Sequence, residues 1–118
     1  MKNRPIPAPH PEIWPHPGAL LREYVLPALN LSVSQASVEL RITRQSLHRI
    51  MAGRAAITAE TSLRLERFCG VPSQFWLRRQ SAHESERARG RMIDVLATIP
   101  AYALPKTVLD QIGTSDAE

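Results

Sequence analysis

The sequence predicts an all-α fold in which five helices build a single domain. Apolar residues recur at helical spacing in successive segments between residues 17 and 91. An N-terminal arm, residues 1–16, and a C-terminal extension, residues 92–118, flank this domain. Residues typical of helix ends bracket its segments: Ser32, Thr43, Thr58 and Ser73 at the starts, Gly53 and Gly70 at the stops.

The bulk composition fits one small domain and makes an anionic partner plausible. The chain has 118 residues and a net charge of +4, and 13 of its 15 basic residues are arginine. The planar arginine fork suits phosphates and guanine edges. The single cysteine, Cys69, excludes an internal disulfide and fits a reducing compartment. No apolar run approaches the roughly 20 residues of a membrane span, and no signal-peptide pattern is present, so we expect a cytoplasmic protein.

The arm of residues 1–16 is rich in proline. Five of the ten prolines lie there, and this density blocks helix and ladder bonding, so we expect an extended arm. It is either a disordered tail or a segment that orders on a partner. Trp14 within it either anchors a partner or packs on its own domain.

The first helix is predicted to start at Pro17 and to run through the segment ALLREYVLPAL. Pro27 should end or bend this helix, and Asn30 suits the turn that follows. Its inward face holds Leu20, Leu21, Tyr24 and Val25.

The second helix is predicted to begin at Val33, because Ser32 and Gln35 have the spacing of a capping box. A turn at Arg41 and Ile42 follows, and Thr43 caps a third helix that ends at Gly53. The buried side of the second helix holds Val33, Ala36, Ser37 and Leu40.

Two further helices complete the domain. The fourth starts after Thr58 and ends at Gly70, with Leu63, Leu65 and Phe68 as its apolar residues. The fifth is capped by Ser73 and continues to about residue 91, with Phe75, Trp76 and Leu77 packing on the core.

The extension, residues 92–118, contains two weaker helical patterns. Val108, Leu109 and Ile112 fit one short turn, and the last residues look frayed. The first of the two patterns forms an apolar face, which suggests contact with either a second copy of the chain or another partner. We predict a homodimer whose interface holds Phe75, Trp76, Met92, Ile93, Leu96 and Ile99.

The second and third helices together predict a helix-turn-helix that docks on duplex DNA. Between Glu39 and Glu60 the chain holds no acidic residue. A solvated amphipathic helix could also carry arginines, but two capped helices joined by a short turn favour a phosphate-facing surface. The same window contains Arg41, Arg44, His48, Arg49 and Arg54.

On a helical wheel, the third helix turns Leu47, Ile50 and Met51 inward. Its outer side carries the predicted base readers, because arginine pairs with guanine and glutamine with adenine. The predicted readers are Arg44, Gln45, His48 and Arg49. The predicted phosphate contacts are Ser34, Gln35, Thr43, Ser46 and Arg54.

Other chemistry is not indicated. The four histidines and Cys69 lack metal-ligand spacing, and no phosphate-binding loop, nucleophile elbow or carboxylate pair is present. Cys69 reads as an inert, buried thiol. We therefore expect no metal, no cofactor and no enzymatic activity.

From residues 16 to 89 the chain resembles the HigA-type (VapI-like) antitoxins of toxin–antitoxin modules, within the Cro/cI-like helix-turn-helix superfamily. Three blocks carry the resemblance, in order: HPGALLRE from His16, GRAAITAETSLRL from Gly53 and FWLRRQ from Phe75. The chain departs from many relatives where Val33 replaces a glutamine and Arg41 replaces the turn glycine.

The resemblance implies a five-helix DNA-binding domain, usually homodimeric, that represses its own operon and neutralises a toxin, commonly a RelE-like mRNA-cleaving ribonuclease. It also implies base reading at Arg44, Gln45 and Arg49. Useful specificity needs a dimer on a palindromic double-stranded operator. Two alternatives stay open: a stand-alone repressor without a toxin, and a protein-interaction module that does not bind DNA.

Overall fold

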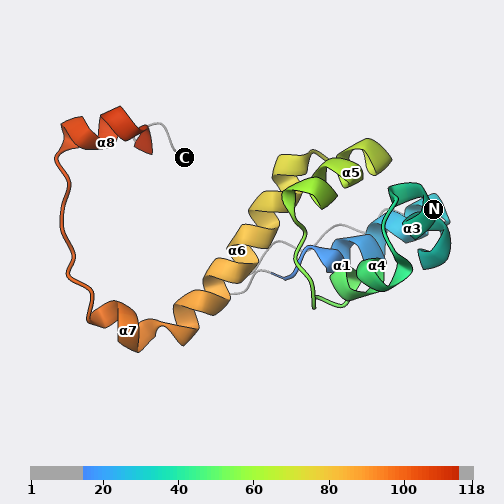
Figure 1. Ribbon diagram of the computed structural model, residues 1–118, viewed down its shortest axis with the longest axis horizontal. Coiled ribbons are helices and arrows are strands. Elements are labelled where there is room, and N and C mark those ends of the chain that lie inside the picture. The colour runs from blue at the N-terminus through green and yellow to red at the C-terminus, as the bar shows by residue number, and fades with distance from the viewer. Residues whose placement is uncertain (1–14, 115–118) are drawn as a thin grey trace.

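The computed structural model describes residues 15–114 of the chain, and every regular element in this range is helical. The arm prediction for residues 1–14, including Trp14, and the frayed-end prediction for residues 115–118 lie outside the described residues. Five helical units pack into one body, and a further stretch carries two short helices away from it (Figure 1). The predicted all-α fold is therefore confirmed.

The first unit is a continuous helical stretch with a wide turn in its middle. It consists of α1 (Gly18–Leu20), the π-helical segment η1 (Leu21–Val25) and α2 (Leu26–Leu29). Pro27 does not end the helix, because the helix runs on to Leu29. The N–H of Leu26 reaches back five residues to Leu21, so Pro27 falls in the first turn of α2, where no N–H is required.

The next two helices are α3 (Val33–Leu40) and α4 (Arg44–Met51). They begin where their caps predict, and they pack against each other through buried faces. Both the capping box before α3 and the threonine cap before α4 are formed. The buried side predicted for α3 is confirmed for Ala36, Ser37 and Leu40.

The body is completed by α5 (Ala59–Cys69) and α6 (Ser73–Arg91), which pack on each other. Thr58 caps α5 and Gly70 ends it at a φ of +82°, as predicted. Leu65 faces the core, whereas Leu63 lies on the outer side of α5 and is 59% exposed. The cap predicted for α6 is wrong. Ser73 is the first helical residue of α6 rather than its cap, and its N–H bonds to the Glu66 side chain at 2.7 Å.

The core lies where all five helical units meet. Trp76 of α6 is 1% exposed, and it is surrounded by aliphatic side chains from the other units. Its indole N–H donates to the Val71 carbonyl at 3.2 Å, so the one polar atom of this large side chain is satisfied. The fully buried aliphatic residues include Leu21, Leu47, Ile57 and Leu65.

Beyond the body lie α7 (Ile93–Ala97) and α8 (Lys106–Ile112). They confirm the two helical patterns of the extension. Figure 1 shows α7 at the C-terminal end of α6, and an extended segment that leads from α7 to α8, which stands apart from the body. None of the helices in the described part of the chain combines the length and apolarity needed to cross a bilayer.

Candidate nucleic-acid interface

The face of α4 that the sequence assigns to base reading is exposed to solvent. Leu47, Ile50 and Met51 are buried, so the opposite side of the helix is fixed outward. All four predicted readers are exposed: Arg44, Gln45, His48 and Arg49. We call these four residues the reading face. It projects from α4 as a recognition helix must if it is to enter a major groove.

The start of α4 is organised by two hydroxyl groups. Thr43 Oγ1 accepts the Ser46 N–H at 2.9 Å and donates its own proton to Ser46 Oγ at 2.8 Å. Both side chains are exposed at the positive end of the helix dipole. The structure therefore brings together two of the predicted phosphate contacts at one helix N-terminus.

The predicted contacts on α3 differ in how much of each side chain is engaged. Gln35 Oε1 accepts the Ser32 N–H at 2.9 Å, so this oxygen is committed to the capping box. Ser34 is exposed in the first turn of α3. Val33 is half-buried against the core, so the first residue of α3 faces inward.

The turn between α3 and α4 contains a residue in a strained backbone conformation and is held by hydrogen bonds from α5. Arg41 adopts a left-handed conformation with φ of +62°, which normally favours glycine. The Arg64 guanidinium of α5 donates to the carbonyls of Leu40 at 2.9 Å and Arg41 at 3.3 Å. Arg64 thus satisfies carbonyls left open at the end of α3 and holds the turn in place.

The loop after α4 brings Arg49 and Arg54 together. The N–H groups of Arg54 and Ala55 both bond to the Arg49 carbonyl, at 2.8 and 3.2 Å. The Arg49 guanidinium lies 3.4 Å from the Arg54 carbonyl oxygen. Arg49, a predicted base reader in the last turn of α4, therefore lies beside Arg54, a predicted phosphate contact in the turn that begins at Gly53 with φ of +77°.

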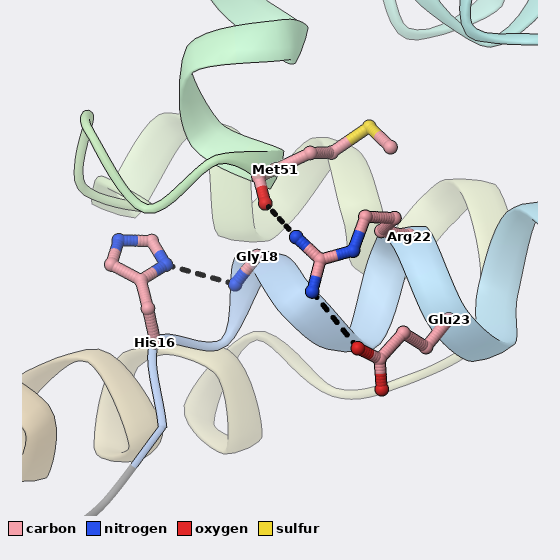
Figure 2. A network of polar contacts seen from close by, with 5 residues as sticks. All are labelled: His16, Gly18, Arg22, Glu23 and Met51. Carbon is pink, nitrogen blue, oxygen red and sulfur yellow. Dashed lines mark hydrogen bonds and ion pairs between the residues drawn. The ribbon is translucent and has the colours of Figure 1, made fainter.

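The C-terminal end of α4 is held against α1 and η1 by contacts that sequence reasoning did not find (Figure 2). Arg22 Nη1 donates to the Met51 carbonyl at 2.9 Å, and its Nη2 pairs with Glu23 at 2.9 Å. Gly18 lies so close to the Ile50 carbonyl that a methyl group would come within 2.7 Å of the carbonyl carbon. Residues of the sequence HPGALLRE thus hold α4 in position. In the sequence, only the family resemblance marked these residues as important.

His16 fixes the same junction from the other side. Its Nδ1 accepts the Gly18 N–H at 3.0 Å, and its ring also hydrogen-bonds to the backbone of Ala55 (Figure 2 shows the first contact). Burial lowers the pKa of His16 below 6.5, and the nearby His83 lowers it further. A neutral ring can accept at Nδ1 and donate at its other nitrogen, so this site needs the unprotonated form.

Gln80 ties α6 to the loop that precedes α5. It is 6% exposed, its Oε1 accepts the Ile57 N–H at 2.8 Å, and its Nε2 donates to Glu84 at 2.9 Å. A buried backbone N–H is thereby satisfied by a residue 23 positions away. Gln80 therefore helps to set where the loop bearing Arg54 emerges.

The residues predicted for a dimer interface divide into two groups. Trp76 is withdrawn from any such surface, because its side chain fills the core of its own chain. Phe75 is half-buried, and the Arg79 guanidinium lies 4.8 Å from its ring centre. The remaining predicted interface residues are all exposed: Met92, Ile93, Leu96 and Ile99.

The histidine, cysteine and acidic side chains of the described residues are dispersed. Between residues 15 and 114 no three histidine, cysteine or acidic side chains gather where they could hold a metal ion. Cys69 is half-buried, and its thiol lies 3.3 Å from the Leu65 carbonyl oxygen.

The chain is similar to known proteins in both sequence and structure. A family model described as helix-turn-helix matches residues 21–76. Virulence-associated protein I of Dichelobacter nodosus is 33% identical over 72% of this chain and 79% of that protein. An addiction module antidote protein of a HigA family from Coxiella burnetii is 30% identical, with a TM-score of 0.70 over 76% of this chain and 99% of that chain. Pseudomonas aeruginosa antitoxin HigA, solved with the higBA promoter, is 25% identical, with a TM-score of 0.66 over 76% and 99%.

Proposed function

The chain belongs to the HigA-type (VapI-like) family of Cro/cI-like helix-turn-helix DNA-binding proteins, and from this we propose that it is an antitoxin that represses its own operon and neutralises a RelE/HigB-like mRNA-cleaving toxin. It is a DNA-binding regulator and not an enzyme. The observation that supports the DNA-binding part is the reading face, which is polar, basic and exposed on a helix held at both ends.

In this proposal the reading face enters the major groove. Arg44, Gln45 and Arg49 make bidentate contacts to base edges, each discriminating by about 1–3 kcal/mol, and His48 flanks them. The phosphate contacts come from both ends of the motif, at Ser34, Gln35, Thr43, Ser46 and Arg54.

Two copies are needed for useful specificity, because one recognition helix reads only a few base pairs. We propose a homodimer on a palindromic operator, with Phe75 and the exposed apolar residues of α7 at the interface. The relative solved with a promoter supports duplex DNA as the ligand of this fold.

The proposed neutralisation of a toxin and the proposed binding to the operator are tested by separate experiments. A footprint on the chain's own promoter should show a protected palindrome, and co-expression should relieve the toxicity of the neighbouring gene's product. Protection without relief would favour a stand-alone repressor. Absence of protection would refute the repressor assignment and favour a protein-interaction module.

A further inference from the structure

The C-terminal extension differs from the rest of the chain in charge. Residues 92–118 hold four acidic residues and one basic residue, a net charge of −3, whereas residues 1–91 hold 14 basic and seven acidic residues, a net charge of +7. Opposite net charges favour contact between the extension and the surface of a body like its own.

The extension also exposes more apolar surface than an isolated arm would tolerate. Ile93, Leu96, Ile99, Leu104 and Ile112 are between 43% and 65% exposed. A seven-residue helix such as α8 is not stable alone in water, so it needs a surface to pack on. The radius of gyration, 17.8 Å, exceeds the roughly 13.5 Å of a compact chain of this length, because the extension stands away from the body (Figure 1).

A groove of matching character lies on the N-terminal half of α6. It is an open concavity of about 480 Å³. Phe75, Pro72 and Ala82 give it apolar walls, while Arg78 and Arg79 give it positive charge. Such a groove suits a short helix with an apolar stripe from an acidic segment.

We propose that α8 of one copy docks in this groove on a second copy, so that two chains exchange their C-terminal extensions. Val108, Leu109 and Ile112 lie on one side of α8 and enter the groove. Lys106 and Asp110 of α8 pair with each other at 2.9 Å, so the net negative charge that complements the arginines comes from the rest of the extension. This inference rests on the homodimer of the proposed function and identifies where the second copy's extension binds.

A second copy fits better than the chain's own groove. The segment of residues 98–105 spans at most about 28 Å, and Pro100 and Pro105 favour its extended form. If two copies pack antiparallel along α6, the N-terminal half of the second copy's α6 lies beside α7 of the first copy. The second copy then covers the exposed face of that α7, and its groove lies next to the point where the first copy's extension leaves α7. Folding back onto its own α6 would instead leave Ile93 and Leu96 uncovered.

Crosslinking of the full-length chain tests this arrangement. In a Cys69→Ser background, Ala82→Cys with Ile112→Cys should give covalent dimers under mild oxidation, seen by mass under non-reducing conditions. Mixing the two single variants should give dimers joined by one crosslink. A disulfide within one chain, or no disulfide, would overturn the proposal.

Sedimentation equilibrium separates this inference from the homodimer itself. Ile112→Asp should raise the dimer dissociation constant about tenfold or more, because an exposed residue that contributes only to the exchanged contact has been made polar. Thr107→Asp, on the polar side of α8, adds the same charge and should change it less than threefold. If the wild type is a dimer and Ile112→Asp has the same dissociation constant, the exchange fails and the homodimer stands. If the wild type is monomeric throughout, both fail.

Discussion

The contact between α1 and α4 makes Gly18 the most sensitive small residue of the domain. In Gly18→Ala, the new methyl group would overlap the Ile50 carbonyl oxygen and lie 2.7 Å from the carbonyl carbon and 3.1 Å from His16 Nδ1. An ordinary contact between carbon atoms is about 3.5 Å. Because Ile50 offers backbone rather than a flexible side chain, α1 must move away from α4 by about 1 Å.

That displacement has a calculable cost. Overpacking a buried site costs about 1–3 kcal/mol. The movement also weakens the bonds from Gly18 to His16 and from Arg22 to Met51, each contributing about 1 kcal/mol or more. We expect the free energy of unfolding to fall by about 3–5 kcal/mol, and the melting temperature to fall by at least roughly 12 °C.

Urea and thermal unfolding followed by circular dichroism measure this change, with Gly90→Ala as the matched control. Gly90 is within α6, and a methyl group there meets no heavy atom within 4 Å. The control should therefore gain about 0.5–1 kcal/mol from better helix propensity. If Gly18→Ala unfolds at the wild-type midpoint, or moves in the same direction as Gly90→Ala, the assigned role of Gly18 is refuted.

Three further predictions follow from the same geometry. In gel-shift titrations, Arg49→Ala should lose about 1–3 kcal/mol of preference for the operator over random DNA, whereas Arg54→Ala should weaken binding to both duplexes about equally. If the two variants behave alike, the division into a base reader and a phosphate contact is contradicted. Gln80→Leu should lower the free energy of unfolding by about 1–3 kcal/mol, because the Ile57 N–H loses its acceptor in the core; an unchanged urea midpoint would argue against this contact. Burial holds the folded-state pKa of His16 below the unfolded value of 6.5, so the unfolded chain binds more protons than the folded chain in this range. The free energy of unfolding should therefore fall as the pH drops from 6.5 toward the folded pKa, and in His16→Asn this loss should diminish. An identical dependence of stability on pH in the two proteins would exclude His16 as the source of the loss.

Local chemistry made much of the motif predictable from sequence. The caps at Ser32, Thr43 and Thr58 and the stop at Gly70 depend on groups within one helical turn of each other, so spacing alone specifies them. The outward direction of Arg49 follows equally from the periodicity of α4. The identity of the bases and phosphates that these side chains contact stays a prediction.

Only the tertiary structure decided how the recognition helix is held. Arg22 meets Met51 across 29 positions, Arg64 meets Leu40 across 24, and neither partner carries a sequence signal for the other. The π-helical turn that admits Pro27 was invisible for the same reason, and so was the exposure of Leu63. These features arise when helices dock, because packing selects which backbone carbonyls stay open and which side chains can reach them. The sequence by itself determined the capped helices and the reading face, and the docking of α1, α5 and α6 determined where that face is held.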